Sequence, residues 1–147
     1  MVNTRLSTTA DLPAQKELWA LAFGDDGAYV DNFYENYYRP GRVMVLEEDG
    51  VVRAMTAWFD TDFVLAGGAH VPAAYLYAVA THPDCRGRGF AARLLRDIGA
   101  HLRDLGYSAL TTVPRRAVPP QLFWCEWLPG VLCPQPIPGK QGGGGPF

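Results

Sequence analysis

Apolar side chains recur between residues 5 and 113 with two periods, one typical of strands and the other typical of helices. Alternating or continuous apolar and β-branched residues predict strands at 5–6, 42–47, 51–59, 62–66, 74–80 and 107–113. Asp49-Gly50, between two of these runs, predicts a tight hairpin. The short run at 62–66 is either a strand of its own or the beginning of the strand at 74–80.

Three further segments carry the signals of amphipathic helices. Asp11 predicts the start of the first helix, and Gly24 predicts its end. The second helix opens at 25–26 and stops at 39–41, and the third runs from 89 to about 105. The predicted core faces are Val30, Phe33, Tyr34, Tyr37 and Tyr38 in the second helix and Phe90, Leu94, Ile98, Leu102 and Leu105 in the third.

A hairpin-rich sheet followed by a strand–helix–strand crossover predicts an α+β or mixed α/β fold, with a central mixed sheet and helices on both faces. A length of 147 residues suits one domain. The pattern changes at Pro114, because eight of the twelve prolines lie in 114–147 and neither period is sustained there. We therefore expect a domain at 1–113, with its C-terminal strands missing or irregular, and a Pro/Gly-rich irregular tail at 114–147.

Charge and composition exclude several classes of partner. The formal net charge of −2 gives no general attraction to nucleic acid or to an anionic membrane. No segment approaches the ~18 to 20 continuous apolar residues of a membrane span, and no signal peptide is visible, so we expect a cytoplasmic protein. The cysteines, Cys85, Cys125 and Cys133, have neither an even count nor metal-ligand spacing, so we expect reduced thiols and no metal site.

The densest chemical signal is the run Arg86-Gly87-Arg88-Gly89-Phe90-Ala91, which follows the strand at 74–80 and opens the third helix. A helix N-terminus presents free backbone N–H groups and the positive end of the helix dipole. Glycines let an anion approach that backbone, and two arginines add charge. The run therefore predicts a cradle for a phosphate or pyrophosphate.

Arg86, Gly89 and Ala91 form the pattern Arg-x-x-Gly-x-Ala, which resembles the acetyl-coenzyme A motif of the GNAT acyltransferases. The run Ala78-Val79-Ala80-Thr81-His82-Pro83 resembles the central strand of that family and its exit. The resemblance covers residues 5–113. It implies a GNAT-like fold, acetyl-CoA as the co-substrate, and acetyl transfer to a primary amine of a small molecule or peptide. A homodimer is left open.

The resemblance also implies how acetyl-CoA is bound. Backbone groups of Ala78 and Ala80 would hold the pantetheine arm between two splayed strands, and an N–H near Val79 would polarise the thioester carbonyl. The pyrophosphate would lie on the backbone of the cradle, formed by Arg86, Gly87, Arg88, Gly89, Phe90 and Ala91. Both arginines would add charge-assisted contacts. Transfer would then be direct, with catalysis largely by positioning.

Direct transfer needs a base for the ammonium and an acid for the departing thiolate. His82, acting through water, and Tyr77 are the catalytic candidates. Tyr75, Phe33 and Tyr34 are the candidates for contacts with the acceptor. Each has a competing structural interpretation. The histidine lies in a Thr-His-Pro turn, the two strand tyrosines share one face, and the helical rings have the spacing of a core face.

Two other functions compete with an active transferase. In the GNAT family the usual acid is a tyrosine on the helix after the fifth strand, and this chain has no tyrosine after Tyr107. A catalytically impaired acyl-CoA-binding module is therefore the alternative. A nucleotide-binding domain is disfavoured, because the sequence contains neither Gly-x-x-x-x-Gly-Lys-Ser/Thr nor Gly-x-Gly-x-x-Gly.

The tail lacks the aromatic-x-x-x-Gly-Phe pattern that the family has after its fifth strand. Codons for Leu122-Phe-Trp-Cys-Glu-Trp-Leu-Pro129, read one base later, permit Phe-Phe-Gly-Ala-Asn-Gly-Phe. Both glycines are forced, because the codons of Trp124 and Trp127 each end in two guanines. We therefore expect that the tail is the product of an altered reading frame and that the domain lacks its final strands.

Overall fold

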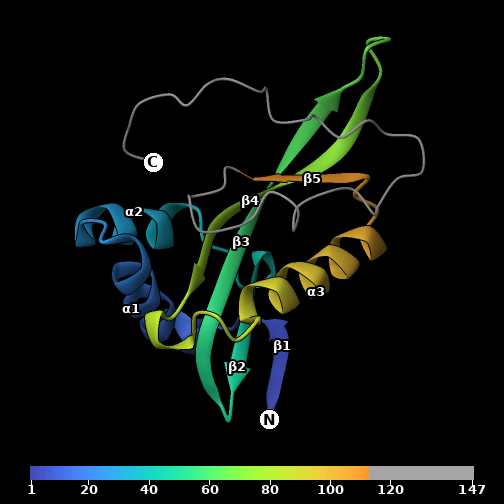
Figure 1. The fold of residues 1–147 in the computed structure, drawn as a ribbon. Helices are drawn as coiled ribbons and strands as arrows, with labels where there is room; N and C mark the ends of the chain where they lie inside the picture. Colours follow the sequence, from blue (N-terminus) through green and yellow to red (C-terminus); the bar gives the residue numbers. More distant parts are fainter. Residues whose placement is uncertain (113–147) are drawn as a thin grey trace, which may run out of the picture.

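The computed structural model describes residues 1–112, which form one mixed sheet with helices on both faces (Figure 1). The strands are β1 (Val2–Leu6), β2 (Val43–Glu48), β3 (Val51–Val64), β4 (His70–Thr81) and β5 (Ala109–Thr112). The helices are α1 (Leu12–Phe23), α2 (Gly27–Asn36) and α3 (Phe90–Asp104), with 3-10 turns η1 (Thr9–Asp11), η2 (Pro40–Arg42) and η3 (Pro83–Cys85). The predicted tail at 114–147 and its missing strands lie outside the described residues.

The strand order in the sheet is β1-β2-β3-β4-β5. The first four strands pair antiparallel with their neighbours, whereas β5 pairs parallel with β4. A parallel pair needs a crossover connection, and α3 supplies it. The prediction of a central mixed sheet with helices on both faces is therefore confirmed.

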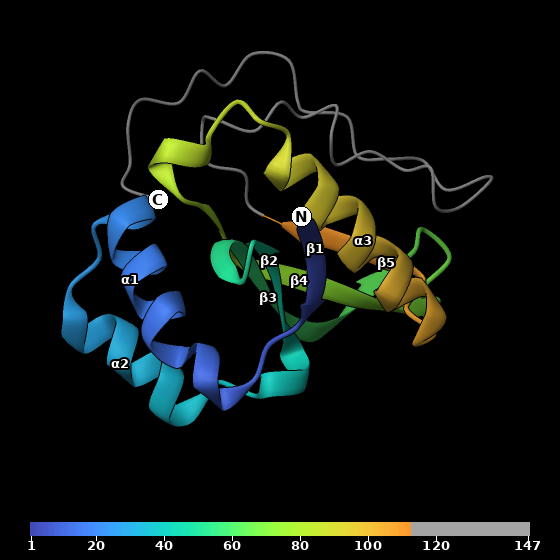
Figure 2. The same ribbon diagram turned by 90° about the horizontal axis from the view of Figure 1, so that it is seen from below.

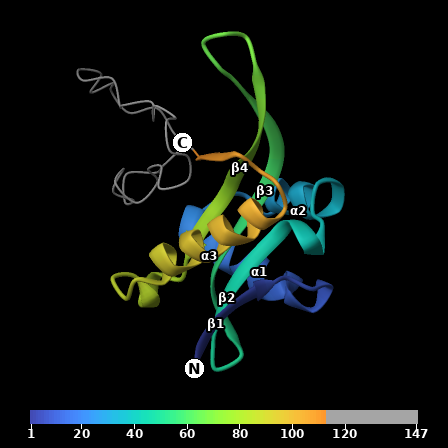
Figure 3. The same ribbon diagram turned by 90° about the vertical axis from the view of Figure 1, so that its right-hand side faces the viewer.

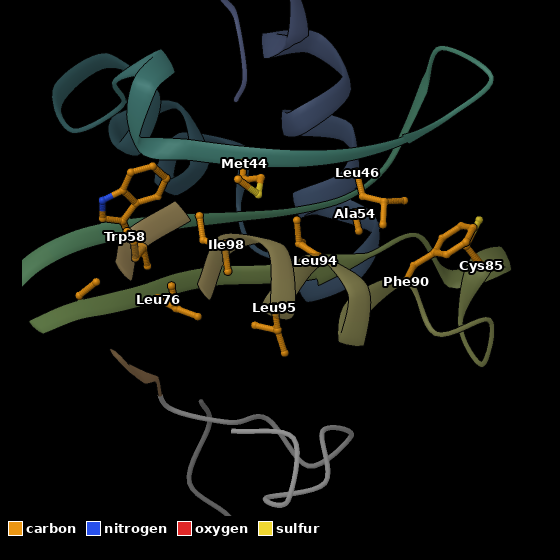
Figure 4. Packing of buried hydrophobic residues seen from close by; sticks show 12 residues of the cluster. Met44, Leu46, Ala54, Trp58, Leu76, Cys85, Phe90, Leu94, Leu95 and Ile98 are labelled. Carbon is orange, nitrogen blue, oxygen red and sulfur yellow. The ribbon is translucent and has the colours of Figure 1, made fainter. Parts of the chain in front are cut away.

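α3 covers one face of the sheet, and α1 and α2 cover the other (Figure 2). Figure 4 shows the first of these interfaces, where Leu94 and Ile98 of α3 pack against strand side chains that include Met44, Trp58 and Leu76. The second interface joins α1 and α2 to the opposite face, through Leu18, Trp19, Val30, Phe33, Tyr34, Val43, Val45, Met55 and Ala57. Two hydrophobic layers thus enclose the sheet.

β2 shows why both faces of the sheet need a helical layer. Met44 and Leu46 belong to the interface with α3, whereas Val43 and Val45 belong to the interface with α1 and α2. All four side chains are buried. Successive side chains of a strand point to opposite faces, so a continuously apolar strand buries all its residues only between two layers.

Glycines end the elements where the sequence predicts. Asp49 and Gly50 have φ of 51° and 81°, which is the geometry of the two-residue turn that their pairing favours. Gly24 follows α1 with φ of 65°, and Gly106 follows α3 with φ of 96°. The predicted hairpin and both predicted helix ends are confirmed.

β3 and β4 form a hairpin arm that extends well beyond the helices (Figure 3). Their pairing continues to Val64 and His70, beyond the predicted strands. Residues 62–64 therefore end β3, and the prediction for 62–66 was wrong in both of its alternatives. The reason is a turn at 65–69, closed by the Leu65 N–H on the Ala69 oxygen at 2.8 Å, which folds the next strand back alongside β3.

Two predicted core residues are exposed at helix ends. α2 stops at Asn36 rather than at 39–41, and Tyr37, whose φ of −121° leaves the helix, is 57% exposed. Leu105 lies one residue past α3 and is 58% exposed. Both residues fit the helical period of the sequence, but that period places a side chain only while the helix continues.

Among residues 1–112, no helix is both long enough and apolar enough to span a membrane.

Candidate functional site

The turn before α3 leaves a row of backbone N–H groups free. Gly87 and Gly89 have φ of 80° and 79°, and α3 begins at Phe90. The N–H of Arg93 is the first that bonds back, to the oxygen of Gly89 at 3.0 Å. Within residues 1–112 the N–H groups from 87 to 92 have no backbone acceptor. This geometry is the one that the predicted anion cradle requires, and its binding of an anion stays a prediction.

The structure gives a different reason for the glycines from the one the sequence suggested. A Cβ placed on Gly87 or on Gly89 would meet no atom within 4 Å, so no protein atom excludes a side chain there. Both residues have left-handed φ values, which cost an L residue about 1–2 kcal/mol. The glycines thus permit the backbone turn, and the space in front of it is open.

The two arginines of the cradle differ in their surroundings. The Arg88 guanidinium donates two hydrogen bonds to the Glu48 carboxylate, at 2.9 and 2.7 Å, and lies 4.5 Å from the centre of the Phe90 ring. The Arg88 ion pair lowers the pKa of Glu48. Arg86 is exposed, and its side chain has no partner among residues 1–112. Arg86 is therefore the cation that is available to a ligand.

β4 carries a bulge opposite β3. The pairing skips from Tyr77 to Ala80, so Thr56 of β3 lies opposite both Ala78 and Val79. Ala78 has φ of 53°, a left-handed conformation that non-glycine residues rarely adopt. The extra residue leaves backbone groups outside the regular ladder, and such bulges are over-represented next to active sites.

The bulge inverts the alternation of side chains along β4. Before it, Leu76 packs on the α3 side of the sheet and Tyr77 on the side of α1 and α2. After it, Val79 packs on the α3 side and Ala80 on the side of α1 and α2. Without the extra residue at Ala78, odd and even positions would keep the same faces throughout.

Among residues 1–112, the same part of β4 has an open edge. In that part of the chain β5 pairs with β4 from Ala73 to Leu76. Beyond Leu76, residues 77–81 have no strand on the side away from β3 within the described part of the chain. This edge leads directly into η3 and the cradle, so an extended ligand could follow β4 toward the start of α3.

A pocket of about 360 Å³ opens on the α1 and α2 side, next to the bulge. It is lined by Tyr29, Asn32, Phe33, Tyr37, Phe59 and Tyr77. Tyr77 precedes the bulge directly, and its hydroxyl shares a hydrogen bond with the hydroxyl of Tyr29. Burial, the bond with Tyr29 and the neighbouring charge of Asp25 raise the pKa of Tyr77. Its phenol therefore stays protonated in neutral solution.

The remaining candidates have different surroundings. Phe33 lines the pocket. Tyr34 is buried in the core, where its hydroxyl donates to the Gln15 side chain at 3.1 Å, and burial raises its pKa. Tyr75 lies beside Tyr77, with ring centres 6.3 Å apart, but is not part of the pocket lining. His82 precedes η3, and its Nδ1 accepts from the Asp84 N–H at 3.1 Å.

Sequence reasoning missed several residues of this site. Tyr29 lies four residues before Phe33, so the helical period could have placed it on the same face. Tyr37 was expected in the core and instead lines the pocket. Phe59 and Glu48 had no local signal, because their partners come from distant segments. Among residues 1–112, no group of three or more His, Cys, Asp or Glu side chains could hold a metal ion.

Several solved structures share the fold of this chain. A GCN5-related N-acetyltransferase from Kribbella flavida is 24% identical with a TM-score of 0.67, over 75% of this chain and 29% of its own. A GNAT family acetyltransferase from Brucella melitensis was solved in complex with acetyl-CoA. It is 22% identical with a TM-score of 0.64, over 80% of this chain and 78% of its own. A transcriptional regulator from Bacillus halodurans is 19% identical with a TM-score of 0.64, over 90% of this chain and 99% of its own.

Coverage differs among these proteins, because this chain spans only 29% of the length of the Kribbella protein and 28% of that of an Anabaena variabilis relative. No curated protein matches the sequence. The family model described as an acetyltransferase (GNAT) domain matches residues 3–119, which is most of the chain. The chain belongs to the GNAT acetyltransferase family.

Proposed function

We propose that this chain transfers an acetyl group from acetyl-CoA to a primary amine of a small molecule or peptide. The observation that carries the proposal is the combination of a free row of N–H groups at the start of α3 with a bulged, open-edged strand leading to it. The first suits a pyrophosphate, and the second suits an extended arm with amide groups.

The described residues fit acetyl-CoA by their donor chemistry. Backbone N–H groups between Gly87 and Ala91 would bind the pyrophosphate, and Arg86 would add a charge-assisted contact. Arg88 would support the turn through Glu48 rather than contact the ligand. Ala78 and Ala80 would offer backbone groups to the arm. The acetyl-CoA would supply the acetyl group as a thioester.

At the bulge, a backbone N–H near Val79 would donate to the thioester carbonyl and stabilise the charge that develops on its oxygen. The amine nitrogen would then form the new C–N bond as the C–S bond breaks, its proton passing to solvent or to a nearby base, while the thiolate takes up a proton. Tyr77 would donate that proton or orient the amine, because its phenol stays protonated beside the bulge. His82 would act through water, with Nε2 as its only free ring nitrogen.

Calorimetry with acetyl-CoA tests the first step. We expect one acetyl-CoA site per chain. We expect Arg86→Ala to weaken acetyl-CoA binding by about tenfold, because the variant loses one charge-assisted contact. Arg96→Ala is the matched control, since Arg96 is another exposed arginine, on α3, away from the cradle. Equal binding by the two variants would contradict the assignment of Arg86.

Acetylation of a panel of primary amines tests the second step. Tyr77→Phe should lower turnover more than it lowers acetyl-CoA binding if the hydroxyl acts on the reacting groups. His82→Gln provides the same comparison for the histidine. A variant that changes neither quantity has no part in catalysis.

A second candidate function is a catalytically impaired acyl-CoA-binding module. The absence of any tyrosine after Tyr107 favours it, because the family's usual acid is then missing. Tight binding of acetyl-CoA without acetylation of any amine in the panel would support this module and contradict the transferase.

A further inference from the structure

The pocket beside Tyr77 is almost entirely aromatic. Five of its six lining residues carry rings, and they come from α2, from Tyr37 directly after it, and from β3 and β4. Phe33, Phe59 and Tyr77 pack against one another and form one aromatic wall, with ring centres 5.7 to 6.1 Å apart and interplanar angles from 38° to 84°. Rings at such spacings offer both faces and edges, which suits a flat apolar group.

Polar groups in the lining are few, and most of them are paired among residues 1–112. The hydroxyls of Tyr29 and Tyr77 bond to each other. The side chain of Asn32 accepts a hydrogen bond from Asn36 at 2.9 Å. Among residues 1–112, no lysine or arginine lines the pocket. An anionic substituent would therefore enter the pocket without a cation, at the cost of its hydration.

A carboxylate, that of Asp25, lies close to the pocket and acts on Tyr77. Asp25 accepts a hydrogen bond from the Trp19 indole at 2.7 Å, and the Trp19 ring lies 5.6 Å from that of Tyr77. α2 also carries Glu35 and Asp31, and Asp31 is paired with Lys16 of α1 at 2.9 Å. A cation near these carboxylates and rings gains both charge attraction and cation–π contacts.

We infer that the pocket takes a cationic primary amine that carries an aromatic or similarly flat apolar group and no anionic substituent. This rests on the proposed function, because it treats the pocket as the acceptor site. It goes further by naming the acceptor class. The aromatic group would lie against the wall formed by Phe33, Phe59 and Tyr77, with the amine directed toward the bulge at Ala78.

Binding without acetyl-CoA tests the inference independently of catalysis. The probes are 2-phenylethylamine, its ring carboxylate 4-(2-aminoethyl)benzoate and the aliphatic amine butylamine, each followed by ligand-observed NMR on the full chain. We expect 2-phenylethylamine to bind at least about tenfold more tightly than either analogue. Equal binding of the carboxylate would overturn the exclusion of anions, and equal binding of butylamine would overturn the aromatic preference.

A charge variant locates the binding. Asn32→Lys adds a cation to the lining of the pocket and should weaken the binding of 2-phenylethylamine by about tenfold. Asn36→Lys is the matched control: it adds the same charge to α2 outside the lining and removes the same Asn32–Asn36 hydrogen bond. Equal effects of the two variants would overturn the location.

Failure of the inference and failure of the proposed function give different results. Acetyl-CoA binding with acetylation of butylamine or the carboxylate, but not of 2-phenylethylamine, would leave the transferase intact and overturn the acceptor class. Binding of 2-phenylethylamine in the pocket without any acetyl-CoA binding would overturn the transferase instead.

Discussion

Arg88 and Glu48 join two turns that are 40 residues apart in the sequence, through two hydrogen bonds between guanidinium and carboxylate. Glu48 ends β2 at the hairpin to β3, and Arg53 of the next strand approaches the same carboxylate at 3.8 Å. Arg88 lies in the cradle before α3. The cradle is therefore attached to the antiparallel half of the sheet as well as to β4.

Glu48→Gln tests whether this ion pair positions the cradle. It should weaken acetyl-CoA binding by about two- to fivefold, as expected for the loss of a surface ion pair that supports but does not touch the ligand. The measurement is calorimetry, with Glu35→Gln as an exposed acidic control. Tighter binding by Glu48→Gln would show instead that Glu48 competes with the ligand for Arg88.

Gly89→Glu should abolish acetyl-CoA binding, because a carboxylate at the helix N-terminus repels the pyrophosphate and competes for the same N–H groups. Gly106→Glu is the matched control, since Gly106 also has a positive φ but follows the other end of α3. Both variants should lose about 1–2 kcal/mol of stability to backbone strain. Unchanged binding by the folded Gly89→Glu protein would refute the cradle as the coenzyme site.

Ala78→Gly should raise the free energy of unfolding by about 0.5–1 kcal/mol. The left-handed φ of Ala78 strains an alanine, and glycine removes that strain at a smaller cost in chain entropy. Ala80→Gly is the control, because Ala80 lies in the same strand, is buried and has no positive φ. This variant should therefore lose stability. Urea unfolding of both variants measures the difference, and destabilisation by Ala78→Gly would argue against the bulge geometry.

The lowered pKa of Asp11 predicts that the stability of the fold depends on pH. Two hydrogen bonds from Arg5, at 2.8 and 2.9 Å, and one from the Thr8 N–H lower the pKa of Asp11 from 3.8 to about 2. A lowered pKa in the folded state stabilises the fold above the unfolded pKa, and the stabilisation disappears as the pH falls through the folded pKa.

Asp11→Asn should therefore lose about 2 kcal/mol at pH 7, and the difference from the parent should shrink between about pH 4 and pH 2. Unfolding curves at several pH values measure it. The exposed Asp104→Asn variant provides the control. A loss for Asp11→Asn that stays constant down to pH 2 would contradict the ion pair with Arg5.

The encoding DNA tests the altered reading frame of the tail. Read one base later, the codons for 122–128 should give an aromatic residue, two glycines at the forced positions and a phenylalanine after the second glycine. A stop codon in that frame shortly after Val113 would exclude the hypothesis. A chain made with the restored frame should gain turnover relative to the present one if the missing segment supplies the acid.

The sequence predicted features that depend on local backbone chemistry. The turn at Asp49-Gly50 and the end of α1 at Gly24 follow from residues that accept a positive φ. The bulge could not be predicted in the same way, because an alanine, not a glycine, holds its left-handed conformation at Ala78. The left-handed conformation of Ala78 is forced only by the pairing of β4 with β3 along the length of β4.

The candidate site also contains one part that local sequence predicts and another part that depends on distant segments. The cradle was predictable because its glycines, arginines and helix start are consecutive in the sequence. The pocket was not, because its walls come from α2, β3 and β4 and meet only in the folded chain. The difference between Arg86 and Arg88 was also hidden, since it depends on Glu48, which a local pattern cannot connect to the cradle.

The extra residue at Ala78 separates β4 into two segments that can change independently. A one-residue shift in the register of the segment before the bulge would turn Tyr77 away from the aromatic pocket and into the layer beneath α3, while leaving Val79 and Ala80 in place. A deletion after it would disturb the approach to the cradle and spare the pocket wall. Acceptor preference and coenzyme recognition can therefore diverge separately on a single strand during evolution.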